Sequence, residues 1–160
     1  MTKVKICGLR RTKDIEIVNK FQPDYIGFVL AKSKRQISLE TAVALKLLLD
    51  PRVKAVGVFV NEPIQNILEY ENHEAIDIIQ LHGDEDLTYI KKLKEVSGLP
   101  IIKAFRIKDE ESLRQQKELI GHPILEGVLL DAYHPTTYGG IGESFDWKLL
   151  DEIHRPYFLA

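Results

Sequence analysis

The feature that most constrains the fold is an alternation of short apolar runs with amphipathic stretches. The runs are rich in Val, Ile, Leu and Phe, as β-strands are. Successive runs start about 20–30 residues apart, which leaves room for one crossover helix between parallel neighbours. Several are apolar throughout, as in strands covered on both faces. We expect strands at Val4–Cys7, Tyr25–Val29, Ala55–Val60, Ile76–Leu81, Ile101–Phe105, Val128–Leu130 and Tyr157–Ala160.

The stretches between these runs carry helix-start signals and apolar faces. Capping or acidic residues predict helix starts at Thr12, Ser38, Asp86 and Asp109, the last with an acidic first turn that suits the helix dipole. Pro63 falls in a first turn, where its missing N–H costs little. The buried faces are expected to carry Ile15, Val18 and Phe21, then Ala42, Leu45 and Leu49, then Ile90, Leu93 and Val96.

Length and composition indicate one cytosolic domain. The chain has 160 residues, a length typical of one domain, and no apolar run approaches the ~20 residues that span a bilayer. The start lacks the apolar stretch of a signal peptide. A net charge of -2 gives no basic excess for nucleic acid. The single cysteine, Cys7, excludes an internal disulfide and a multi-cysteine zinc site.

Strands that alternate with helices in one α/β domain favour either a doubly wound sheet or a (β/α)8 barrel. No G-x-G-x-x-G follows the first apolar run, so the dinucleotide-binding version lacks its fingerprint. A barrel makes a further demand, because its chemistry gathers at the carboxyl ends of the strands.

Polar residues do fall at those ends. Cys7, His82 and Asp131 end predicted strands, Arg106 lies just past one, and a loop after the second strand carries the basic run 32–35. Each has a plainer interpretation: a packed thiol, a histidine bonded to backbone, a turn cap, a solvated loop. Their placement on one predicted rim favours a site.

The pairing of a thiol with a carboxylate has a chemical logic. An aldose–ketose shift needs one group to protonate the ring oxygen and another to remove a proton from carbon, and two titratable side chains can divide these roles. The thiolate is the reactive basic form of cysteine. The sequence has no His/Asp/Glu cluster with metal-ligand spacing.

The same residues stand in stretches that resemble the phosphoribosylanthranilate isomerases. The resemblance runs in order from residue 4 to residue 160, and the compatible spacings make it specific. It is carried by Val4–Leu9, Tyr25–Val29, Lys32–Ser38, Val56–Asn61, Gln80–Asp84, Ile102–Arg106, Leu129–Asp131, Tyr138–Gly142 and Phe145–Trp147.

The resemblance implies a (β/α)8 TIM barrel without cofactor that rearranges N-(5-phosphoribosyl)anthranilate in tryptophan biosynthesis. By motif, Cys7 would be the general base and Asp131 the general acid. Arg35 would bind the anthranilate carboxylate. The pocket and its covering loop would be formed by His82, Arg106, Gly139 and Gly140.

The family's chain should continue past Ala160. We therefore expect residues 1–160 to form a single, truncated barrel of about six and a half βα units, without strand 8 and without the loops that usually hold phosphate. The strand 1 and strand 7 edges would then be open to pairing. An inactive fragment, or a subunit completed by a partner chain or homodimer, remains the alternative. A different sugar-phosphate enzyme, such as an epimerase, fits the Cys7 and Asp131 pairing less well.

Overall fold

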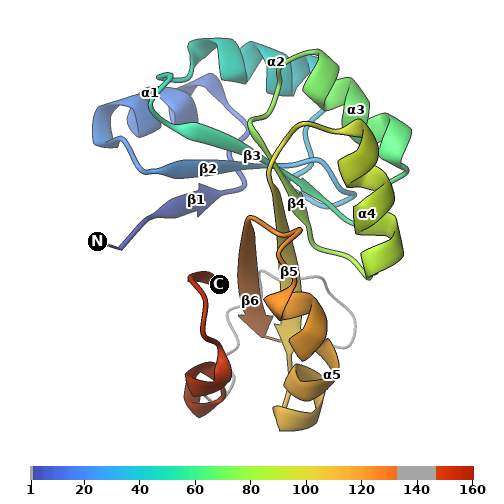
Figure 1. Cartoon of the computed structure of the whole chain (residues 1–160). Coiled ribbons are helices and arrows are strands. Elements are labelled where there is room, and N and C mark those ends of the chain that lie inside the picture. The colour runs from blue at the N-terminus through green and yellow to red at the C-terminus, as the bar shows by residue number, and fades with distance from the viewer. Residues whose placement is uncertain (1, 133–146) are drawn as a thin grey trace.

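The structure is a computed structural model that describes residues 2–132 and 147–160. Its strands form one curled sheet, and helices lie along the outer side of that sheet (Figure 1). The strands are β1 (Lys5–Cys7), β2 (Tyr25–Val29), β3 (Lys54–Phe59), β4 (Ile78–Leu81), β5 (Ile101–Ile107), β6 (Gly127–Ala132) and β7 (Tyr157–Leu159). The helices are α1 (Thr12–Phe21), α2 (Leu39–Leu48), α3 (Ile64–Asn72), α4 (Leu87–Val96), α5 (Glu110–Gly121) and the 3-10 helix η1 (Trp147–Glu152).

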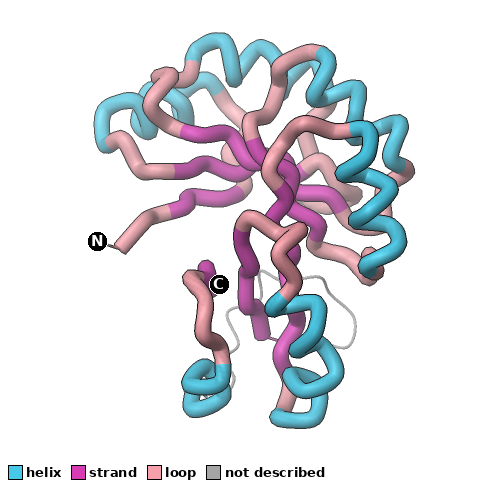
Figure 2. The backbone as a smooth tube through the Cα atoms, in the orientation of Figure 1, coloured by secondary structure: helices cyan, strands magenta, loops and turns pink. Residues whose placement is uncertain are grey.

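The strand order decides between the two α/β architectures. Each strand pairs in parallel with the next, in the order β1-β2-β3-β4-β5-β6-β7. A doubly wound sheet reverses its order at a switch point, and no reversal occurs here. Figure 2 shows the strands gathered inside an arc of helices. The prediction of a TIM-barrel-type α/β fold is confirmed.

The apolar residues form two layers because neighbouring residues of a strand point to opposite faces. The larger layer lies between the sheet and the helices, and includes Ile26, Phe28, Ile79 and Leu130. The smaller layer lies on the inner face, where Ile102, Ala104 and Leu129 pack together. The inner face is thus only partly filled by apolar side chains, and its polar residues are the ones that concern function.

The predicted helix faces are largely confirmed. Two residues were assigned to the wrong side: Phe21 is 73% exposed and Val96 is 58% exposed. Each lies six residues after the first buried residue of its helix, which places it about 120° around the axis from that residue. The residues that are buried as predicted are Ile15, Val18, Ala42, Leu45, Leu49, Ile90 and Leu93.

Three of the predicted caps are confirmed, since Ser38, Asp86 and Asp109 each accept a hydrogen bond from a backbone N–H of the following turn. The prediction for Thr12 was wrong. Thr12 is already helical, and Arg11 is the N-cap. The carboxylate of Asp14 accepts from the backbone N–H groups of Arg10 and Arg11 instead, at 3.1 and 3.0 Å. An acidic residue inside the first turn has taken over the capping role.

Some of the predicted residues fall outside the part of the chain that the structure describes. The glycines Gly139 and Gly140 lie outside the described residues, as does most of the long loop predicted at 132–144. Within the described ranges, none of the helices has both the length and the apolar character needed to cross a bilayer.

Candidate active site

Cys7 stands at the carboxyl end of β1, and its side chain is exposed. The plainer interpretation as a buried packing residue is therefore wrong. Cys7 pairs with Gly27 of β2, where an added Cβ would lie 2.5 Å from the Cys7 Sγ. A glycine at position 27 thus gives the thiol its room. Lys5 shares the Cys7 face of β1; burial lowers the pKa of Lys5, and the interaction with Cys7 opposes that shift.

Arg35 reaches back to the turn that follows Cys7. Gly8 has φ +92°, a conformation that favours glycine. A Cβ at Gly8 would lie 2.9 Å from Arg35 Cδ and 3.0 Å from Arg35 Nη1. The Arg10 guanidinium donates to the Lys34 carbonyl at 2.9 Å, which ties the two loops together. The structure therefore brings Arg35 against Gly8, the residue that follows Cys7.

Asp131 and His82 meet on the opposite part of the rim. His82 Nε2 lies 3.2 Å from Asp131 Oδ2, and both side chains are almost fully buried. His82 Nδ1 lies 2.8 Å from the amide nitrogen of Gln80, which is 1% exposed. A buried chain of polar contacts therefore leads from β4 to β6. Sequence reasoning named its last two members and missed Gln80.

Arg106 lies inside β5, not just past it as predicted, and β6 continues one residue beyond Asp131 to Ala132. β5 and β6 pair with each other over these added residues, and Arg106 lies opposite Asp131 in the register. The Arg106 guanidinium forms an ion pair with Asp84 from the loop after β4. Arg106 therefore stands beside Asp131 in the sheet, while His82, just after β4, contacts the Asp131 carboxyl group directly.

The predicted acid and base share the inner face of the sheet. Cys7 and Leu129 line one cavity of about 870 Å³ that is bordered by β1, β2 and β7. Asp131 follows Leu129 by two residues, so its side chain points to the same face. The rim thus holds two groups: Cys7 with Arg35, and Asp131 with His82 and Arg106. A thiol and a carboxylate therefore stand on one face of the sheet at the carboxyl ends of β1 and β6, a placement that suits proton transfers to and from one small molecule.

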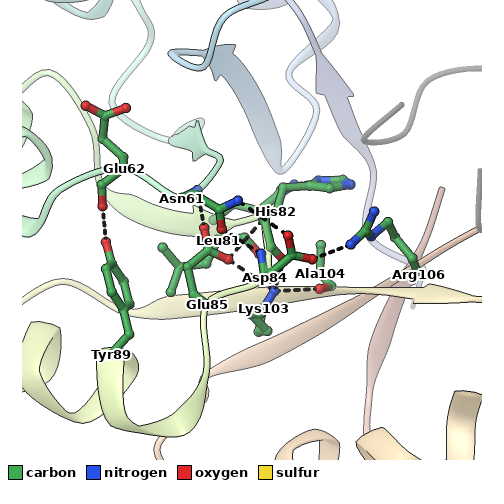
Figure 3. Close-up of polar contacts among 12 residues, drawn as sticks. Asn61, Glu62, Leu81, His82, Asp84, Glu85, Tyr89, Lys103, Ala104 and Arg106 are labelled. Atoms are coloured by element: carbon green, nitrogen blue, oxygen red, sulfur yellow. Dashed lines mark hydrogen bonds and ion pairs between the residues drawn. The ribbon is translucent and has the colours of Figure 1, made fainter. Parts of the chain in front are cut away.

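A buried ion pair supports the His82 loop from below (Figure 3). Lys103 Nζ lies 3.2 Å from Glu85 Oε2, with side-chain exposures of 4% and 1%. Lys103 also donates to the carbonyls of Gly83 at 2.8 Å and Ala104 at 3.0 Å. Burial lowers the pKa of Lys103, and Glu85 opposes this shift. Sequence reasoning missed the pair, although a lysine within an apolar strand was a signal.

Glu85 links two rim loops through backbone donors. Its Oε1 accepts from the Asn61 N–H at 2.8 Å and its Oε2 from the Gly83 N–H at 2.9 Å. Asn61 Oδ1 in turn accepts from the Asp84 N–H at 2.7 Å. Figure 3 shows these contacts together with Tyr89, whose hydroxyl donates to the Glu62 carbonyl at 2.6 Å. The loops after β3 and β4 therefore form one fixed unit.

Comparison with known proteins places the chain. The profile of the family described as N-(5'-phosphoribosyl)anthranilate (PRA) isomerase matches residues 4–160. The chain belongs to the PRA isomerase family. The N-(5'-phosphoribosyl)anthranilate isomerase of Endomicrobium trichonymphae is 46% identical over 160 residues, which are all of this chain and 76% of the relative.

Solved PRA isomerase structures agree with the fold. The enzyme from Thermotoga maritima superimposes with a TM-score of 0.86 at 34% identity, covering 100% of this chain and 77% of that one. A PRA isomerase in complex with reduced 1-(o-carboxyphenylamino)-1-deoxyribulose 5-phosphate gives 0.81 at 31% identity, covering 99% and 75%.

The close fit between Gly83 and Asn61 gives a first prediction. A Cβ on Gly83 would lie 2.4 Å from Asn61 Oδ1 and 2.7 Å from the Asn61 backbone nitrogen. Gly83→Ala should therefore destabilise the chain by about 1–3 kcal/mol, as overpacking does. Gly121→Ala is the matched control, because a Cβ there meets nothing within 4 Å. Denaturant unfolding of both variants tests this, and equal midpoints would contradict it.

Proposed function

We propose that the chain isomerises N-(5'-phosphoribosyl)anthranilate to 1-(2-carboxyphenylamino)-1-deoxyribulose 5-phosphate, the Amadori step of tryptophan biosynthesis. Family membership supports the reaction. The observation that carries the proposal is the placement of Cys7 and Asp131 on one inner face at the carboxyl ends of β1 and β6. Catalytic groups of TIM barrels stand at those ends.

Asp131 acts as the general acid. Its proton passes to the furanose ring oxygen, the bond between that oxygen and C1 breaks, and the anthranilate nitrogen forms a double bond to C1. The contact of 3.2 Å with His82 Nε2 orients the Asp131 carboxyl group. Arg106 stands beside Asp131 on the adjacent strand β5, and His82 reaches it from the end of β4. General acid–base groups of this kind contribute about 10²–10⁴ in rate.

Cys7 acts as the general base. Its thiolate removes the proton from C2 of the opened sugar, and the electrons of that bond move into the C1–C2 bond to neutralise the iminium nitrogen. The resulting enaminol becomes the ketone when C1 gains a proton and the C2 hydroxyl loses one. The Lys5 side chain shares the Cys7 face of β1 and interacts with the thiol.

Arg35 binds the anthranilate carboxylate. The guanidinium is a planar fork that matches a carboxylate, which makes arginine better suited than lysine to this task. Its contact with the Gly8 turn holds it beside Cys7, so the aromatic ring of the substrate would lie over β1 and β2. Gly139 and Gly140, outside the described residues, are proposed as part of the loop over the site.

We further propose that a partner strand pairs with the open edges of the sheet. In the described sheet, β1 pairs with β2 and β7 pairs with β6, at opposite ends of the strand order. The cavity of about 870 Å³ opens beside both strands. A strand that bonds β1 and β7 together would close the barrel and satisfy edge groups that otherwise invite aggregation. A homodimer is a second way to cover these edges.

Isomerase assays test the reaction and the partner strand together. Loss of phosphoribosylanthranilate fluorescence should be followed for the 160-residue chain alone and with the part of the Endomicrobium trichonymphae enzyme that lies outside the match. We expect the added segment to raise turnover. Because Ala160 N–H bonds to β6, the Leu159 N–H points to the open edge, and Leu159→Pro should abolish the increase. If the chain turns over substrate at the same rate with and without the segment, the proposal of a partner strand is refuted. If neither sample turns over substrate, the proposed reaction is refuted.

A further inference from the structure

Gln80 is a buried polar residue to which the proposed reaction gives no role. It sits in β4 between Ile79 and Leu81, both fully buried, and it is itself 1% exposed. Its amide nitrogen contacts His82 Nδ1 at 2.8 Å. Within the part of the chain that the structure describes, Gln80 Oε1 is the buried side-chain atom that lacks a hydrogen-bond partner. A buried acceptor without a hydrogen bond lowers stability. The Gln80 amide nitrogen therefore keeps its contact with His82 while the amide oxygen has no partner.

The orientation of the Gln80 amide, with its NH₂ group toward Nδ1, determines which ring nitrogen of His82 carries hydrogen. An amide NH₂ group can only donate, so Nδ1 must be the acceptor and carry no proton. In a neutral imidazole the hydrogen is then on Nε2. Nε2 lies 3.2 Å from Asp131 Oδ2, and His82 therefore donates to that oxygen. Gln80 acts on Asp131 through the ring, without touching it.

We infer that Gln80 is a positioning residue that sets where Asp131 keeps its transferable proton. Since Oδ2 accepts from His82, the proton of the carboxylic acid is carried by Oδ1, the oxygen not engaged by the ring. When that proton moves to the furanose oxygen, the Nε2–H bond remains and stabilises the carboxylate that forms. This inference rests on the proposed acid role of Asp131, but its first consequence, the tautomer of His82, does not depend on turnover.

The reversed amide gives the opposite arrangement. Gln80 Oε1 would accept from Nδ1–H, and the bare Nε2 would accept a proton from Asp131. The acid's hydrogen would then point at the ring and away from the substrate. The two orientations therefore predict different tautomers of one histidine, which is a measurable difference.

The deciding experiment reads the tautomer of His82 in the full chain. Two-bond ¹H–¹⁵N correlation spectra of histidine-labelled protein near neutral pH distinguish the two forms, and His82→Gln identifies the signal by its loss. We expect hydrogen on Nε2 in the unaltered chain. Gln80→Met, which removes the donor, should release the ring to a mixture of forms, while Gln116→Met on α5 should leave it unchanged. Hydrogen on Nδ1 in the unaltered chain would overturn the inference, whatever the activity.

Kinetics of Gln80 variants provide a second readout. Gln80→Glu keeps the shape but offers acceptors to Nδ1, so it should reverse the tautomer. We expect kcat to fall about tenfold for Gln80→Met, the loss of one hydrogen bond, and further for Gln80→Glu, with KM little changed. A purely structural role would lower unfolding midpoints without this order in kcat. If the tautomer of His82 changes in both variants and kcat does not, the tautomer does not control proton transfer from Asp131. That result would overturn the inference.

Discussion

Cys7→Ala is expected to lower kcat by about 10²–10⁴, the contribution of a general base, while leaving the chain folded. The thiol is exposed at the strand end and fills a space over Gly27, so its removal leaves no buried cavity. Binding of reduced 1-(o-carboxyphenylamino)-1-deoxyribulose 5-phosphate, the ligand of a solved relative, should change little because Arg35 is untouched. Assay of phosphoribosylanthranilate turnover beside a binding titration measures both effects.

Asp131→Asn should produce a loss of similar size, since the amide keeps the shape but cannot supply the acid's proton. The matched control is Asp24→Asn. Asp24 Oδ2 accepts from the Val4 N–H at 2.8 Å, at the opposite end of the strands from the rim. Its replacement should cost some stability and no specific activity. Near-normal kcat in Cys7→Ala or Asp131→Asn would remove that residue from its proposed role.

The strands and helices could be predicted from the sequence because their signals are local. Apolar runs mark every strand of the sheet, and Ser38, Asp86 and Asp109 mark helix starts through side chains that bond the nearest backbone. The predicted ends of strands were wrong where pairing with a residue distant in the sequence determines how far the strand extends. Arg106 looks like the first residue of a loop because it is charged, yet pairing with Asp131 of β6 draws it into β5.

The candidate site was predictable in outline for the same reason. The ends of parallel strands lie together at one rim, so the placement of Cys7, His82 and Asp131 followed once the strands were recognised. The supporting contacts were not predictable, because they join residues on different elements. Lys103 within an apolar strand signals a buried charge, but nothing in a chain with 29% charged residues singles out Glu85 as its partner. Only the folded sheet places one against the other out of water.

That buried pair gives the second large effect, on stability. Glu85→Gln is expected to lower the free energy of unfolding by about 3–5 kcal/mol, because it leaves the Lys103 ammonium without its counter-charge in a site that is 4% exposed. The amide also offers a single acceptor where the backbone N–H groups of Asn61 and Gly83 each require one. Denaturant unfolding at neutral pH measures the loss.

Lys117 and Glu152 form the matched control. They are the same residue types at the same distance of 3.2 Å, but their side chains are 62% and 45% exposed. Exposed pairs contribute about 0–1 kcal/mol, so Glu152→Gln should have little effect. Equal losses in the two variants would contradict the assignment of Lys103 and Glu85 as a supporting pair.

The pH dependence of stability separates a buried charge from a simple packing defect. Burial lowers the pKa of Lys103 in the folded chain below 10.5, and Glu85 opposes the shift. Between the folded and unfolded pKa values the unfolded chain binds more protons, so stability rises with pH in that window. Without Glu85 the folded pKa falls further, and the rise should begin at lower pH. We therefore expect Glu85→Gln to recover part of its lost stability as pH increases toward 10, relative to the unaltered chain. A deficit that stays constant with pH would indicate that lost packing, and not the unpaired ammonium, causes the destabilisation.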